Sequence, residues 1–265
     1  MTAIQRIIQI SDTHLAREPG PIRPGYPDSD RQLDAVLAAL RAREPQPECL
    51  LLTGDLAEDP QPEAYARLLE HLTRHADGWP VAAVAGNHDD PATLQQVLAG
   101  AGHGVHGHRR LGDWLLVGLD SCRPGHAGGQ LATDELDRLE DTLAQHPQAP
   151  SVIAVHHPPV PIGSAWMDRM GLANPAALFA VLDRHPQVRA CVFGHIHQDF
   201  RGERRGVQLL GCPATCVQFR PHADQLEVDP RPAGYRVLEL HADGRLSSRV
   251  ERVTVGVATA EGLRA

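Results

Sequence analysis

Short apolar runs of strand length alternate with amphipathic segments along the first two thirds of the chain. In residues 31–43, for example, Leu33, Val36, Leu37 and Leu40 form one face of a helix. The pattern predicts strands at 4–10, 49–53, 81–85, 115–119, 151–155 and 190–193, and helices at 31–43, 63–75, 133–145 and 174–184. Regular alternation of this kind predicts a mainly parallel, buried sheet with helices on both faces.

The pattern changes after residue 198, where strand-like segments follow one another without helices between them. They span 200–204, 207–210, 215–219, 235–241 and 245–255, and the turn Ala242-Asp243-Gly244 is typical of a hairpin. We therefore expect the C-terminal third to be antiparallel and to form a second sheet packed against the first. The proline-rich loops 19–27 and 229–232 are expected to be ordered surface segments.

Composition narrows the class of protein. With 265 residues, 42% of them hydrophobic, the chain can form one large α/β domain or two small ones. No linker or internal repeat interrupts it, so we predict a single domain over 1–265, with a catalytic core at about 4–220 and a β-rich segment at about 221–256. Five scattered cysteines argue against a disulfide framework and against a structural zinc site.

Charge and hydropathy exclude two groups of partners. No apolar run approaches the roughly 18 residues of a membrane-spanning helix, and the N-terminus resembles a strand rather than a signal peptide. These features predict a cytoplasmic protein without a membrane partner. The net charge of −8 and the lack of Lys or Arg runs argue against binding of long nucleic acids.

Five polar blocks rich in histidine and carboxylate follow predicted strands. Open α/β sheets bind ligands beyond the carboxyl ends of their strands, so these blocks should meet at one rim. Aspartate and histidine together suit Mn, Fe or Zn, and a pair of such ions can clamp the attacking and leaving oxygens of a phosphoryl transfer. Asp-x-His and Gly-Asp alone are weak signals and Gly-Asn-His-Asp and Gly-His-x-His are moderately specific, but the five blocks in this order predict a two-metal site. The blocks are Asp12-Thr13-His14, Gly54-Asp55, Gly86-Asn87-His88-Asp89, His156-His157-Pro158-Pro159 and Gly194-His195-Ile196-His197.

Together these blocks resemble the calcineurin-like metallophosphoesterase superfamily, over about residues 4–220. The resemblance implies an α/β fold of four layers, an αββα sandwich of two mixed sheets flanked by helices. It implies two divalent or trivalent transition-metal ions, Fe and/or Mn, with Zn as an alternative. The implied ligands of the first ion are Asp12, His14, Asp55 and His197, and those of the second are the bridging Asp55 with Asn87, His156 and His195.

The same resemblance implies catalytic roles for Asn87 and His88. His88 would touch the phosphate and stabilise or protonate the leaving oxygen, and Asn87, His88 and His197 would contact the substrate. His157 would point away from His156, because neighbouring residues on a strand alternate sides, and it is expected to be structural.

Within the superfamily the chain looks most like the bacterial class III cyclic nucleotide phosphodiesterases. The segments that carry this likeness are 156–161, 194–198, 213–222 and 234–236. It implies an enzyme that hydrolyses 3′,5′-cyclic AMP to 5′-AMP by attack of a metal-bridging hydroxide, and it suggests a homodimer. Two alternatives remain open: a phosphodiesterase for another small diester, such as a glycerophosphodiester or a 2′,3′-cyclic nucleotide, and a non-catalytic scaffold. Arg123, His222 and Arg236 are candidates for contact with the base or ribose, although a structural role is favoured for each.

Overall fold

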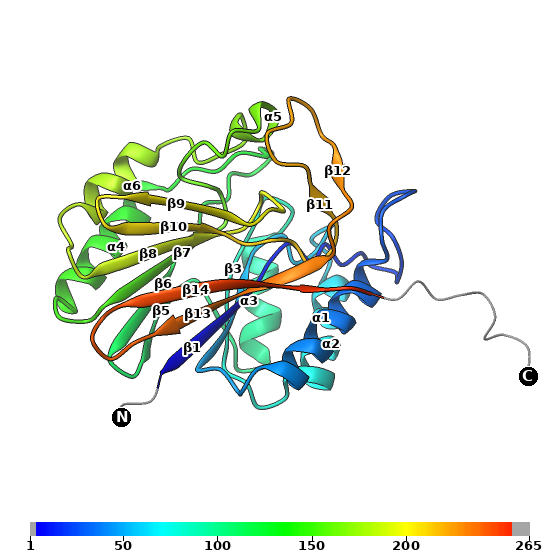
Figure 1. Cartoon of the computed structure of the whole chain (residues 1–265), viewed down its shortest axis with the longest axis horizontal. Coiled ribbons are helices and arrows are strands. Elements are labelled where there is room, and N and C mark those ends of the chain that lie inside the picture. Colours follow the sequence, from blue (N-terminus) through cyan, green and yellow to red (C-terminus); the bar gives the residue numbers. More distant parts are fainter. Residues whose placement is uncertain (1–3, 256–265) are drawn as a thin grey trace, which may run out of the picture.

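Two six-stranded sheets form the centre of the computed structural model, which describes residues 4–255 (Figure 1). The ends of the predicted domain, 1–3 and 256–265, lie outside the described residues. The first sheet has the order β14-β13-β1-β2-β3-β4, with β1 Gln5–Ile10, β2 Cys49–Thr53, β3 Val81–Val84, β4 Gly104–Val105, β13 Ala233–Leu240 and β14 Leu246–Val253. The second has the order β5-β6-β7-β8-β10-β9, with β5 Gly107–Leu111, β6 Trp114–Gly118, β7 Ser151–Val155, β8 Val188–Phe193, β9 Phe200–Arg204 and β10 Val207–Gly211.

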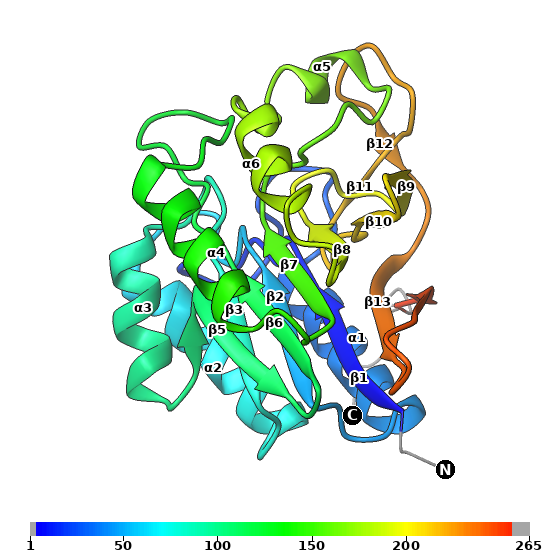
Figure 2. The same cartoon turned by 90° about the vertical axis from the view of Figure 1, so that its left-hand side faces the viewer.

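Helices cover the outer face of each sheet, and the two inner faces pack on each other (Figures 1 and 2). On the first sheet lie α1 Ser29–Arg43, α2 Pro62–Ala76 and α3 Pro91–Gly100, and on the second lie α4 Thr133–Gln145 and α6 Pro175–Leu182. Side chains such as Ile7, Leu51, Leu116 and Val152 fill the space between the sheets. The four-layer αββα sandwich is therefore confirmed.

The division of strands between the sheets differs from the sequence prediction in two respects. The predicted single parallel sheet with helices on both faces is wrong, because β1–β4 and β6–β8 belong to different sheets. The chain crosses between the sheets at His106 and Gly107, which both have left-handed backbone angles (φ 55° and 75°). The C-terminal third is also not a separate sheet: β9 and β10 extend the second sheet, whereas β13 and β14 return to the first beside β1.

Most predicted elements agree with the structure to within two residues at either end. The exception that matters for the site is the predicted strand 215–219, which is reduced to β11 Gln218–Phe219, paired with β12 Val228–Asp229. The reason is that the Thr215 amide donates to the Ser11 carbonyl at 3.0 Å, which fixes this segment at the end of β1 rather than in a ladder. Together with α5 Ala165–Asp168, the β11–β12 pair lies at the top of Figure 2.

Candidate metal centre

Loops that follow five strands bring all seven predicted metal ligands to one place. His14 Nε2 lies 3.3 Å from His197 Nε2, which in turn lies 3.4 Å from Asp12 Oδ1. His156 Nε2 lies 3.3 Å from Asp55 Oδ2. The remaining two ligands are also within contact of His156 Nε2: Asn87 Oδ1 at 3.3 Å and His195 Nδ1 at 3.2 Å.

The backbone at these loops is bent into the left-handed region. The φ angles are 54° at Asp12, 44° at His14, 49° at Asp55, 68° at His195 and 51° at His197. Asp and His adopt this conformation more readily than most residues. The bends turn consecutive side chains from the strand ends towards a common point.

Close approach at two glycines completes the geometry. A Cβ at Gly54 would overlap the imidazole of His156, and a Cβ at Gly86 would overlap Asp55. These glycines let the loops after β2 and β3 pass against the ligands of their neighbours.

Hydrogen bonds define which nitrogen each histidine offers to a metal. In His197, Nδ1 donates to the Val217 carbonyl at 2.7 Å, and in His14, Nδ1 donates to the Glu58 carboxylate at 2.7 Å. Both Nε2 atoms are then left with lone pairs, and these face each other at 3.3 Å. Two lone pairs at that distance repel unless a proton or a metal cation lies between them, so the arrangement fits a bound metal ion.

The second half of the centre follows the same rule. His156 Nδ1 donates a hydrogen bond to the Thr53 carbonyl at 2.7 Å. The lone pair of His156 Nε2 is then free to bind a cation beside Asp55 and Asn87. His195 presents Nδ1 to the same position, and its Nε2 is buried without a partner.

Electrostatics favour positive charge at the centre. Asp12 and Asp55 are buried, which opposes ionisation, but the surrounding histidines hold the pKa of each carboxyl below its usual value. Burial likewise opposes a charged imidazole at His156, yet Asp55 raises the pKa of His156 to about 9. The carboxylates thus stabilise a cation at this position, whether a proton or a metal ion supplies the charge.

His88 and His157 lie next to the metal-ligand residues. His88 donates its backbone N–H to Asp55 Oδ1 at 2.8 Å, and its Nδ1 donates to the Glu58 carbonyl at 3.0 Å, so Nε2 remains available to the cavity. The expectation that His157 points away from His156 is wrong, since the two rings lie 4.9 Å apart. The structural reading of His157 agrees with its buried hydrogen bond to Ser121 Oγ at 2.7 Å.

A cavity of about 210 Å³ opens above the ligands, and its far wall is apolar and aromatic. The loop 19–27 contributes to this wall and is therefore more than a surface segment. None of the three candidate base-contacting residues is among the described residues that line the cavity; Arg236 is fully buried and donates to Asp199 at 2.6 Å. The residues of the wall are Ile22, Arg23, Tyr26, Trp166, Met167, Met170, Val217, Phe219 and Leu226.

Two supporting residues were not predicted from the sequence. Glu58 orients His14, but an acidic residue in a loop gives no sequence signal of such a role. Asp89 accepts hydrogen bonds from the amides of Leu56, Ala57 and Gly86, and so ties the loop after β2 to the loop after β3. Its place in the Gly86–Asp89 block was the one available signal.

The αββα sandwich and the convergent Asp, Asn and His side chains define a protein of the metal-dependent phosphoesterase class. Residues 5–199 match the family model of the calcineurin-like phosphoesterases. The chain belongs to this family.

Curated relatives and solved structures extend the comparison. The chain is 38% identical over 247 residues to the 3′,5′-cyclic adenosine monophosphate phosphodiesterase CpdA of Pseudomonas aeruginosa, covering 93% of this chain and 89% of that protein. It is 35% identical over 249 residues to CpdA of Escherichia coli strain K12, covering 94% and 90%. A dimetal phosphatase from Danio rerio has the same fold, with a TM-score of 0.68, 17% identity and coverage of 95% of this chain and 99% of that one. Within residues 4–255, the helices are not long and apolar enough to cross a membrane.

Proposed function

We propose that this protein is a metal-dependent phosphodiesterase that hydrolyses 3′,5′-cyclic AMP to 5′-AMP. The observation that carries the proposal is the cavity, which sets five of the seven predicted metal ligands opposite an aromatic wall of the kind that a nucleoside can contact. Relatives named as cyclic AMP phosphodiesterases align over more than nine tenths of the chain, which supports the same substrate class.

The ligand residues divide into two sets around the bridging carboxylate. Asp12, His14, Asp55 and His197 would hold one ion, and Asp55, Asn87, His156 and His195 the other. Bound Fe, Mn or Zn ions would polarise the phosphodiester and lower the pKa of a water molecule at this position. Asn87 contributes an oxygen without a further negative charge, which keeps the centre attractive to an anionic diester.

The proposed role of His88 is to protonate the oxygen that leaves phosphorus. A water oxygen forms a new bond to phosphorus and gives up a proton to solvent, the bond between phosphorus and the ribose 3′ oxygen breaks, and that oxygen takes a proton from Nε2 of His88. The ring is held in place because Nδ1 donates to the Glu58 carbonyl, with the Glu58 carboxylate 3.6 Å away. Asn87, His88 and His197 all line the cavity, in agreement with contact with the substrate.

The aromatic wall supports a nucleoside substrate over a simple diester. Trp166 and Phe219 meet edge to face at 5.2 Å, and Phe219 stacks on the His197 ring at 4.2 Å. Tyr26 lines the same cavity. Stacking of a base on an aromatic side chain is worth about 1–3 kcal/mol, which would favour a nucleotide over a diester without an aromatic ring, such as a glycerophosphodiester.

A substrate panel on protein of measured metal content tests the assignment. It should include 3′,5′-cyclic AMP, 3′,5′-cyclic GMP, 2′,3′-cyclic AMP, a glycerophosphodiester and methyl para-nitrophenyl phosphate. We expect the highest kcat/KM with 3′,5′-cyclic AMP, and Trp166→Ala should lower that value about tenfold while sparing the glycerophosphodiester. A rate for cyclic AMP no higher than for methyl para-nitrophenyl phosphate would count against the physiological assignment.

The role of His88 is tested by the leaving group. His88→Ala should keep its metal content and slow cyclic AMP hydrolysis by at least about 100-fold, with a much smaller effect on para-nitrophenyl esters. His126→Ala, an exposed histidine in a neighbouring loop, is the matched control and should have no effect. Equal losses for both leaving groups would contradict proton donation by His88.

We also propose a cytoplasmic enzyme of one domain that forms a homodimer and does not bind long nucleic acids. The acidic net charge of −8 supports the last point. Sedimentation analysis of the purified protein, alone and with a DNA duplex, would test the oligomeric state and the absence of nucleic-acid binding.

A further inference from the structure

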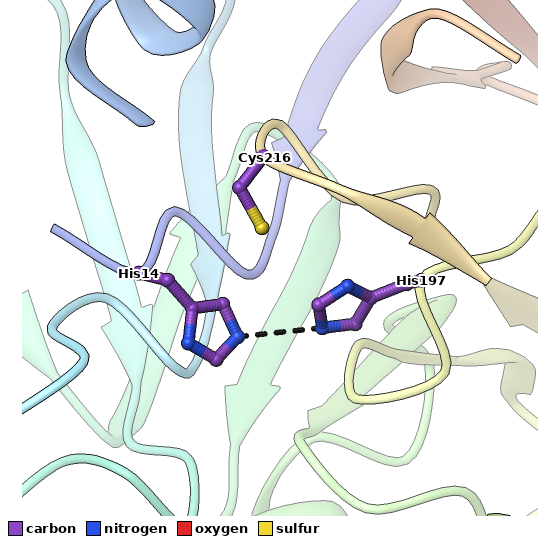
Figure 3. Close-up of side chains that lie close together, drawn as sticks. All are labelled: His14, His197 and Cys216. Carbon is purple, nitrogen blue, oxygen red and sulfur yellow. Dashed lines mark hydrogen bonds between the residues drawn. The ribbon is translucent and has the colours of Figure 1, made fainter. Parts of the chain in front are cut away.

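Cys216 lies against the first half of the metal centre. The Sγ atom of Cys216 and one ring nitrogen from each of His14 and His197 all lie within 4.8 Å of one another. Figure 3 shows the Cys216 side chain directed towards the gap between the two rings. The residue is only 4% exposed, so the sulfur is enclosed with the histidines rather than presented to solvent.

The position of Cys216 is fixed by the backbone on both sides. The amide of Thr215 donates to the Ser11 carbonyl at 3.0 Å, one residue before Asp12. The carbonyl of Val217 accepts the hydrogen bond from His197 Nδ1 at 2.7 Å. The segment that carries the thiol is therefore tied both to the loop after β1 and to a metal-ligand ring.

The distances suit shared coordination. Metal–nitrogen bonds of about 2.0–2.1 Å and metal–sulfur bonds of about 2.3 Å allow two donors on one ion to lie up to roughly 4.4 Å apart. The three ligand atoms of Cys216, His14 and His197 lie within 4.8 Å of one another, a spacing of the order that shared coordination requires. His14 Nε2 and His197 Nε2, 3.3 Å apart, already provide a pair of nitrogen atoms at this position.

We propose that Cys216 supplies a sulfur donor to the metal ion held by His14 and His197. The thiol gives its proton to solvent when the sulfur binds, and the thiolate adds one negative charge to the carboxylate and imidazole donors. A thiolate favours Zn, Fe or Co over Mg or Ca, so Cys216 tunes this half of the centre for a softer ion. The proposal rests on the proposed metal centre and not on the choice of substrate.

Cobalt substitution provides a direct readout that does not depend on activity. Wild-type protein, stripped with a chelator and loaded with Co²⁺, should show a near-ultraviolet sulfur-to-cobalt charge-transfer band. Cys216→Ser should lose the band while keeping bound cobalt, and its affinity for Zn²⁺ should fall at least about tenfold relative to its affinity for Mn²⁺. Cys191→Ala, which alters a fully buried cysteine of β8 in the core beneath the helices, should behave like the wild type.

Each outcome separates the proposal from its alternatives. Cobalt-loaded wild type without the band would show that Cys216 is not a ligand, even if Cys216→Ser failed to fold. Wild type that binds no cobalt would overturn both this proposal and the metal centre. A normal band in a protein that does not hydrolyse cyclic AMP would support Cys216 as a ligand and refute only the proposed substrate.

Discussion

Removal of the Asp89 carboxylate should loosen the metal centre without touching a metal-ligand side chain. Oδ1 of Asp89 accepts from the amides of Leu56 and Ala57 and from the Tyr65 hydroxyl, each at 3.1 Å. Oδ2 accepts from the Gly86 amide at 2.8 Å. Asp89→Ala would leave three buried amides, from two different loops, without an acceptor.

The expected loss in the free energy of unfolding follows from two opposing terms. Each unsatisfied buried amide costs about 1–3 kcal/mol, so three cost about 6 kcal/mol. Burial and the nearby Asp55 charge raise the pKa of Asp89 from 3.8 to about 6, and a rise of this size corresponds to about 3 kcal/mol, a cost that alanine removes. We expect Asp89→Ala to be destabilised by about 3 kcal/mol at neutral pH.

The neighbouring Asp90 provides the matched control. Its side chain accepts from the Thr93 amide at 2.8 Å and caps α3, and loss of such a cap costs about 1 kcal/mol. Urea unfolding of chelator-treated protein, followed by circular dichroism, should therefore give a clearly lower free energy of unfolding for Asp89→Ala than for Asp90→Ala. Only Asp89→Ala should also weaken metal binding, because it alone frees the loops of Asp55 and Asn87. Equal destabilisation, or unchanged metal affinity in Asp89→Ala, would refute the reasoning.

Three further predictions concern the loops, the pH dependence and the metal. Gly54→Ala should abolish metal binding, measured by isothermal titration, because the new Cβ would overlap His156. Gly78 also has a positive φ but faces open space, so Gly78→Ala should only lower the free energy of unfolding by about 1–2 kcal/mol. Burial disfavours the charged form of His71, but hydrogen bonds to the carboxylates of Asp30 and Asp34 raise the pKa of His71 above 6.5. The charged imidazole therefore stabilises the folded protein fully below about pH 6.5, and this stabilisation is lost as the pH rises through the folded-state pKa. Urea unfolding should accordingly show that the advantage of wild type over His71→Gln shrinks as the pH is raised above about 6.5, and a constant difference would contradict the assignment. Chelation should lower the Tm in a scanning fluorimetry assay, and added Mn²⁺ should restore it in a concentration-dependent way; a Tm indifferent to both would argue against a metal centre.

The convergence of the predicted metal ligands could be inferred from sequence because much of their geometry is local. A strand followed by Gly-Asp, or by Gly-His-x-His, places the polar side chain at the carboxyl end of that strand regardless of how the strands are shared between sheets. The convergence of Asp12, Asp55, His156 and His195 therefore depended on strand direction alone, and the structure brings them together.

The division into two sheets could not be predicted in this way. Alternating strands and helices give the same periodicity whether consecutive strands pair or lie in opposite layers. The switch depends on the bend at His106 and Gly107, where the His106 ring accepts a hydrogen bond from the Ala85 amide at 3.0 Å. That contact is tertiary, as are those that bring Tyr26 and Trp166 to the cavity wall and Cys216 to the metal-ligand histidines.

The predicted metal centre combines three energetic costs that cation binding would offset. Five of the eight non-glycine residues at positive φ among the described residues are predicted metal ligands, and each carries a backbone cost of about 1–2 kcal/mol. His14 Nε2 and His197 Nε2 lie 3.3 Å apart, and the carboxylates of Asp12 and Asp55 are buried close to one another. Bonds such as Asp12 N–H to the Gly54 carbonyl hold the strained loops in place, so the centre cannot relax by moving its ligands apart. Since cations remove the repulsion and compensate the strain, the free energy of metal binding must contribute directly to the stability of the folded protein.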